Sequence, residues 1–109
     1  MRWNIITVTI FIENKSKNDF LIKLNNFDWE LNIHIGNQEL YLLKMIRFAN
    51  WDTKSSIKAG TSSSSAVFWV YDEKNKMISI CVGHDDETWD FAVCVPITII
   101  EEAFEKLYA

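Results

Sequence analysis

The sequence predicts a mainly β protein of the α+β class, with a curved antiparallel sheet or half-barrel of about six or seven strands and a C-terminal helix. Three patterns support this fold class. Apolar and polar side chains alternate without a break over residues 27–35, and three short apolar runs separated by polar turns fill residues 66–95. The apolar spacing then lengthens to that of a helix near residue 98. A length of 109 residues fits a single domain, spanning residues 1–109.

The N-terminal third is expected to contain three strands. Apolar and β-branched residues occupy both faces of the run 3–12, which predicts a strand covered on both sides. The polar residues 13–19 are typical of a turn, and residues 20–24 of a short strand. The strand 27–35 is expected to bury one face and to expose the other. The buried face would consist of Phe27, Trp29, Leu31, Ile33 and Ile35, and the exposed face of Asp28, Glu30, Asn32 and His34.

The middle of the chain is less regular. Gly36 and Asn37 both tolerate positive φ, so we expect a two-residue hairpin turn there and a strand over 39–48. A helix is the alternative over 37–49, because the apolar residues of this segment also recur at helical spacing. Residues 50–65 are polar and rich in serine, which predicts a long link without regular structure.

The C-terminal half is expected to form a meander followed by a helix. Strands are predicted over 66–71, 77–82 and 89–95. Thr98 and Glu101 have capping-box spacing, which predicts that the helix begins there. Its buried face would consist of Ile97, Ile100, Phe104, Leu107 and Tyr108.

No feature of the sequence indicates export or membrane insertion. No apolar run approaches the roughly 18 residues that span a bilayer, and the N-terminus lacks the apolar core of a signal peptide. Cys81 and Cys94 lie in apolar runs and are expected to be buried free thiols. A cytoplasmic location is therefore expected.

The chain offers few parts for catalysis. Its histidines are isolated, its cysteines lie in apolar strands, and its three glycines form no phosphate loop. The run 84–87 would need further ligands from elsewhere to hold a metal ion. We therefore expect no enzyme activity, no catalytic residues, no metal and no cofactor. Scattered basic residues and a net charge of −4 disfavour nucleic acid as a ligand.

Protein binding is the remaining class of function. Residues 85–109 hold seven acidic residues and one lysine, a net charge of −6, whereas residues 1–84 carry +2. This asymmetry favours a basic protein partner. The turn near residue 88 is predicted to bind it through carboxylates around one aromatic anchor, with a second patch on the exposed face of strand 27–35. The predicted partner-binding residues are Asp85, Asp86, Glu87, Trp89 and Asp90, with Asp28 and Glu30 in the second patch. Ordinary solvated surfaces are the alternative for both patches.

The last third of the chain, from the final strand through Val95-Pro96-Ile97 into the closing helix, resembles the ending of small bacterial immunity proteins. These proteins belong to polymorphic-toxin and contact-dependent growth inhibition systems. The resemblance implies a protein that binds and neutralises a cognate basic toxin domain, a nuclease, by blocking its active site or substrate groove. Two alternatives stay open: a host or phage-encoded adaptor or anti-defence protein, and a small-ligand-binding half-barrel with Trp29 or Trp69 lining its cavity. Toxin identity and oligomeric state stay undefined.

Overall fold

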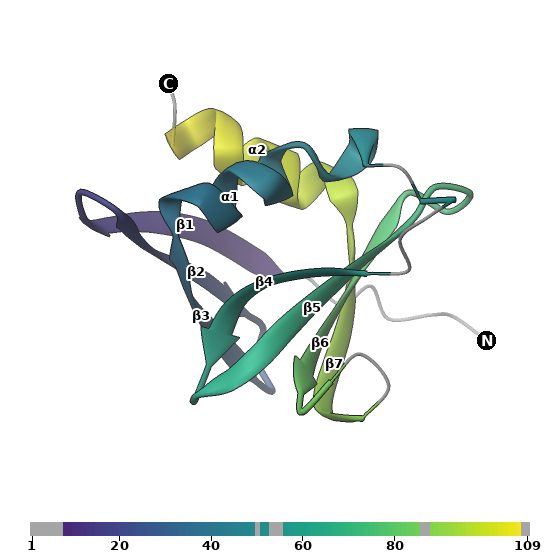
Figure 1. Cartoon of the computed structure of the whole chain (residues 1–109), viewed down its shortest axis with the longest axis horizontal. Coiled ribbons are helices and arrows are strands. Elements are labelled where there is room, and N and C mark those ends of the chain that lie inside the picture. Colours follow the sequence, from purple (N-terminus) through teal and green to yellow (C-terminus); the bar gives the residue numbers. More distant parts are fainter. Residues whose placement is uncertain (1–7, 50, 53–55, 86–87, 108–109) are drawn as a thin grey trace.

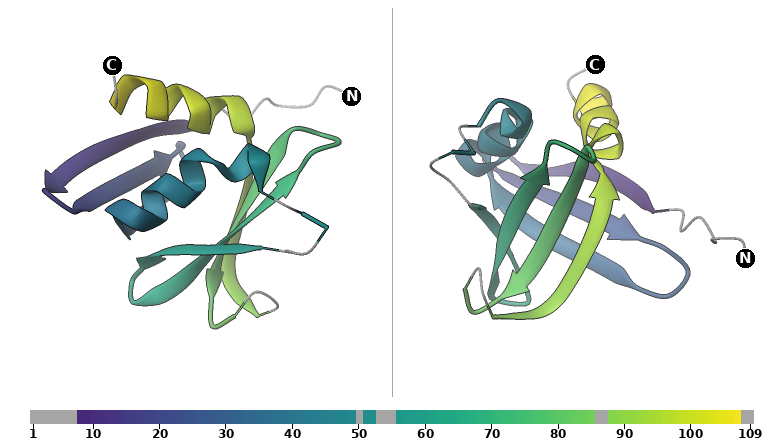
Figure 2. Two further views of the ribbon diagram at one scale, coloured as in Figure 1. Left: turned by 45° about the horizontal axis from the view of Figure 1, so that its top comes forward. Right: turned by 90° about the vertical axis from the view of Figure 1, so that its right-hand side faces the viewer.

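A computed structural model describes residues 8–49, 51–52, 56–85 and 88–107 of the chain. One antiparallel sheet contains seven strands in chain order, and both helices lie together over one end of it (Figures 1 and 2). The predicted fold class is confirmed, with a curved and largely open sheet and a C-terminal helix. The strands are β1 (Thr9–Ser16), β2 (Asp19–Asn25), β3 (Glu30–Gly36), β4 (Ile57–Ser62), β5 (Ser65–Asp72), β6 (Met77–Gly83) and β7 (Trp89–Pro96). The helices are α1 (Asn37–Lys44), the short 3-10 helix η1 (Ile46–Phe48) and α2 (Ile97–Leu107).

The hydrophobic core lies inside the curve of the sheet and beneath the helices. Leu24, Ile33, Trp69 and Ile80 are among its fully buried side chains. β1 to β3 form one half of the curve and β4 to β7 the other, and these halves meet at a narrow seam where His34 pairs with Thr61. α2 packs against β1, so the last element of the chain contacts the first.

Residues 37–48 are helical, so the predicted hairpin at Gly36 and strand over 39–48 are wrong. Gly36 is extended, with φ of −81°. The Glu39 carboxylate accepts hydrogen bonds from the backbone N–H groups of Gly36 (3.4 Å) and Gly60 (2.9 Å). The first contact closes the start of α1, and the second ties the helix to β4. On the inner face of the helical segment, Leu40, Leu43 and Ile46 are buried.

The predicted link 50–65 is also corrected, because it contains β4. Ile57 and Ala59 are buried in the core, and Gly60 breaks the alternation at a bulge with φ of +86°. The serine run supplies the β4–β5 turn, in which Ser63 and Ser64 both have positive φ. Residues 50 and 53–55 of the link lie outside the described residues.

The N-terminal strands differ from their predicted limits. β1 continues to Ser16, so the predicted turn 13–19 shrinks to residues 17 and 18, while residues 3–7 lie outside the described part. The described part of β1 is not covered on both sides: Phe11 is 39% exposed, with the Lys23 ammonium 5.6 Å from its ring centre. Phe27 precedes β3 and lies in solvent, because β3 starts only at Glu30.

α2 begins at Ile97, one residue before the predicted cap. The Ile97 N–H donates to the Lys76 carbonyl oxygen at 2.9 Å. The Glu101 carboxylate binds the Arg47 guanidinium through Nε (2.9 Å) and Nη2 (2.8 Å) and does not complete a capping box with Thr98. The buried face is confirmed in part and consists of Ile97, Ile100, Ala103 and Phe104. Leu107 is half-buried, and Tyr108 lies outside the described residues.

The two cysteines have different surroundings. Both are free thiols, but only Cys81 is buried, and the prediction that Cys94 is buried is wrong. Cys94 lies on β7, which pairs with a neighbouring strand on one side only. Burial raises the pKa of the Cys81 thiol, and the nearby Cys94 thiol adds to that rise.

We expect iodoacetamide to alkylate Cys94 rapidly and Cys81 only slowly, because the thiolate is the reactive form and burial disfavours it. Peptide mass spectrometry over a time course measures the two rates separately. The Cys94→Ser variant should lose the fast reaction, and urea should restore reactivity to Cys81. Equal rates in the folded protein would contradict the burial of Cys81.

Candidate protein-binding surface

Three turns lie at the end of the sheet opposite the helices (Figure 1), and the β2–β3 turn lies to one side of the other two (Figure 2). They join β2 to β3, β4 to β5 and β6 to β7. Both predicted binding patches lie here, with Asp28 in the first turn and Asp85 in the third, and with Glu30 and Asp90 at the starts of β3 and β7. All four side chains are exposed. We call these four residues the acidic end. The other two predicted carboxylates, Asp86 and Glu87, lie outside the described residues.

Two contacts join the patches that the sequence predicted separately. The rings of Trp29 and Phe91 meet edge to face, with centres 5.7 Å apart and planes at 69°. Glu30 on β3 and Asp90 on β7 line the same depression, of about 260 Å³. The curvature of the sheet therefore combines residues about 60 positions apart in the chain into one surface.

The β2–β3 turn is held by the side chain of Asn26. Its Oδ1 accepts hydrogen bonds from the backbone N–H groups of Asp28 (2.8 Å) and Trp29 (3.0 Å). The backbone N–H of Asn26 donates to the Trp29 carbonyl oxygen (3.0 Å). This arrangement is a turn closed by an asparagine side chain. It places Phe27 and Asp28 at the tip, where Phe27 is 90% exposed.

The β6–β7 turn is held by the carboxylate of Asp85. Its Oδ1 accepts a hydrogen bond from the Thr88 N–H at 2.7 Å, and the His84 N–H donates to the Thr88 carbonyl oxygen at 3.1 Å. A Cβ at Gly83 would collide with that same carbonyl group, so the close approach of the chain requires glycine. Trp89 follows the turn and is 51% exposed.

Negative charge dominates this end of the molecule. Segments 24–31, 61–66 and 82–91 together contain six acidic residues and no lysine or arginine. Among the described residues, no ion pair is formed by Asp28, Glu30 or Asp90. Lys23 on the adjacent β2 is bound by Glu13 at 3.3 Å, and the hydrogen bonds from Lys15 and Lys23 lower the pKa of that glutamate. The acidic end therefore keeps a negative potential.

The predicted acidic C-terminal quarter, in contrast, is not one surface. Glu101, Glu102 and Glu105 lie on α2, at the opposite end from Asp85 and Asp90 (Figure 1). Glu101 is already bound by a cation, and this pairing raises the pKa of the Arg47 guanidinium. The order of the strands was the signal that could have separated these two groups of carboxylates, because alternate turns of a meander lie at the same end of a sheet.

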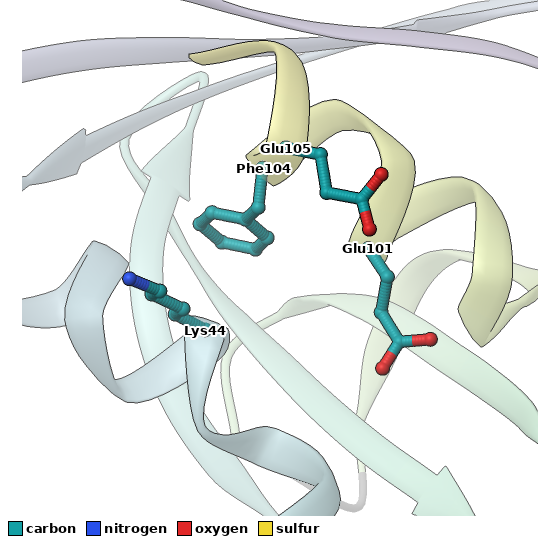
Figure 3. A pocket seen from close by; sticks show the side chains of 4 residues that line it. All are labelled: Lys44, Glu101, Phe104 and Glu105. Atoms are coloured by element: carbon teal, nitrogen blue, oxygen red, sulfur yellow. The ribbon is translucent and has the colours of Figure 1, made fainter. Parts of the chain in front are cut away.

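The helix end has a different character. A groove of about 510 Å³ runs between the helices, with Lys44 on α1 opposite Phe104 and Glu105 on α2, while the Glu101 carboxylate is turned away from Lys44 (Figure 3). The side chains that line this groove carry charges of both signs. Beside it, the outer face of α1 and η1 exposes a stripe of four large apolar side chains: Tyr41, Leu42, Met45 and Phe48.

The two tryptophans proposed to line a ligand cavity lie in different settings. Trp69 is packed in the core, and its indole N–H donates to the Ala59 carbonyl oxygen at 2.8 Å. Trp29 lines an open depression beside β7, of about 400 Å³. Within the described ranges, no group of three histidine, cysteine or acidic residues could hold a metal ion.

No helix in the described part of the chain has the length and apolar character needed to cross a membrane. No protein-family model matches this chain, and comparison with curated proteins and with solved structures likewise gives no match.

Proposed function

We propose that this chain is an immunity-type protein that uses its acidic end to bind a basic toxin domain, a nuclease, and blocks the active site or substrate groove. The supporting observation is that Glu30 and Asp90 line one depression, at the end that also carries Asp28 and Asp85, and that the described segments 24–31, 61–66, 82–85 and 88–91 contain no lysine or arginine. A nuclease has a cationic groove because its substrate is a polyanion. A surface that carries several carboxylates at one end is complementary to such a groove.

Binding would use charge and aromatic contacts in different ways. The carboxylates would attract the cationic partner from a distance and raise the rate of association. Phe27 and Trp89 flank the carboxylates and expose large ring surfaces, which lose water on contact and slow dissociation. Aromatic residues are enriched among the residues that dominate interface energies, so these two are the expected anchors.

The test is rescue of growth. The tagged full chain is used to isolate its partner from the native organism, and the partner is then produced alone and together with this chain. We expect the partner to stop growth alone and the chain to restore it. A captured protein that is harmless alone would contradict an immunity function and support the adaptor alternative.

Charge reversal then tests the surface. Asp28→Lys combined with Asp90→Lys should lower the association rate about 10-fold or more at low salt and abolish rescue. Asp85 is left unchanged because its carboxylate holds the β6–β7 turn. Glu102→Lys with Glu105→Lys is the matched control, since it makes the same change in charge at the helix end. Equal losses in the two double variants would contradict the proposed surface.

A further inference from the structure

We infer that the depression between Glu30 and Asp90 is a receptor for one arginine side chain of the partner. This inference rests on the proposed function and adds the chemistry of the central contact. The depression lies at the mouth of the curved sheet, with acidic residues from β3 and β7, apolar side chains from β3, β6 and β7, and serines from the β4–β5 hairpin. Its volume of about 260 Å³ is below the range of about 300–1,000 Å³ typical of small-molecule sites, and suits a single side chain.

Ser62 is the observation that points to a ligand. It is only 8% exposed, and no other serine, threonine, amide or charged side chain among the described residues is buried. It lies on the same inward side of β4 as Ile57 and Ala59, lines the depression, and receives no side-chain hydrogen bond from the described residues. The fully enclosed polar side-chain atoms without a partner among the described residues are Asn32 Oδ1 and the Tyr71 hydroxyl, so the Ser62 hydroxyl keeps access to solvent. From the lining of the depression it can accept a hydrogen bond from an incoming donor.

The lining matches arginine along its whole length. Leu31 and Val82 supply an apolar wall for the methylene stem. The guanidinium is planar and carries five N–H donors, which the carboxylates of Glu30 and Asp90 and the hydroxyl of Ser62 can accept. Phe91 also lines the depression, and its aromatic ring is a further group that a guanidinium can contact. Lysine presents three donors from one point and no plane, so it uses this lining less fully.

The direct test is a nuclear magnetic resonance titration of the ¹⁵N-labelled full chain with N-acetyl-arginine methylamide. We expect saturable shifts confined to the amides around Glu30, Ser62 and Asp90. N-acetyl-lysine methylamide should bind about 10-fold more weakly, the difference made by one hydrogen bond to a charged group. Equal binding of the two probes, or shifts spread over other surfaces, would overturn the assignment.

Three variants locate the contact. Glu30→Gln with Asp90→Asn should abolish the saturable shifts, whereas Glu102→Gln with Glu105→Gln, which removes the same charge elsewhere, should leave them unchanged. Ser62→Ala should weaken arginine binding several-fold without lowering the urea midpoint, because its hydroxyl has no internal hydrogen bond to lose. A clear loss of stability in Ser62→Ala would show that the hydroxyl is already used and would overturn its role.

The result separates this inference from the proposed function. If arginine does not bind but rescue of growth still depends on Asp28 and Asp90, the arginine receptor is wrong and the immunity function stands. If arginine binds in the depression but the variant with Asp28→Lys and Asp90→Lys still rescues growth, the arginine receptor stands and the proposed function is wrong.

Discussion

Replacing Trp69 with alanine is expected to lower the free energy of unfolding by about 3–5 kcal/mol, the cost of removing a large aromatic side chain from a core. Trp69 is 1% exposed at the centre of β5. The substitution would leave a large cavity and would also remove the donor to the Ala59 carbonyl oxygen at 2.8 Å. Because domains of this size have a stability of only about 5–15 kcal/mol, the loss would be a substantial part of the total. Urea unfolding followed by circular dichroism measures it.

Two further variants separate the contributions at Trp69. Trp69→Phe keeps most of the apolar volume and leaves the Ala59 carbonyl group unpaired, so it should cost about 1–3 kcal/mol. Phe27→Ala removes an aromatic side chain that is 90% exposed and should change stability by no more than about 0.5 kcal/mol. Similar losses in Phe27→Ala and Trp69→Ala would contradict the described core.

Gly60→Ala should destabilise the protein by about 2–5 kcal/mol, the sum of a strained backbone and a steric clash. Gly60 has φ of +86°, and a Cβ there would lie 2.7 Å from Cγ2 of Ile33 and 3.0 Å from the His34 carbonyl oxygen. The position is at the bulge of β4, where the two halves of the sheet meet. The strain therefore acts on the narrow seam that joins them.

Gly36→Ala is the matched control for this prediction. Gly36 has φ of −81°, and its added Cβ would meet Glu39 Oε1 at an ordinary 3.7 Å. Alanine at a compatible position commonly stabilises by about 0.4–1 kcal/mol because it restricts the unfolded chain. Thermal unfolding of both variants measures the contrast. A Gly60→Ala variant as stable as Gly36→Ala would show that β4 does not have the described bulge.

The parts of the fold that local patterns determine were predictable. The alternation in β3 and in the meander β5 to β7 reflects burial of one or both faces, and α2 has one apolar face, so each pattern is visible within ten or so residues. The segment 37–48 was misassigned because its helical start depends on Glu39, whose carboxylate binds the backbone of Gly60 on a strand that the sequence did not indicate. Contacts between residues 21 positions apart leave no local pattern.

The candidate surface was predictable in pieces. Asp28, Glu30, Asp85, Trp89 and Asp90 were singled out from local charge, and the structure brings them to one end. Their union could not be predicted from charge alone, because it depends on the curvature that brings β3 and β7 together. The total charge of residues 85–109 was misleading for the same reason. Asp85 and Asp90 are close to the glutamates of α2 in the sequence, but the fold places the two groups at opposite ends. Arg47 also neutralises one of these glutamates, Glu101.

The strictly sequential order of the seven strands has a kinetic consequence. Each strand pairs with the one synthesised immediately before it. Five of the six pairings close a turn of two to five residues and cost little chain entropy, whereas the pairing of β3 with β4 must close over residues 37–56. A nascent chain could therefore add strands as they leave the ribosome, without waiting for distant partners. The packing of α2 against β1 joins the first and last elements of the described chain, so this docking is expected to be the final and slowest event in assembly.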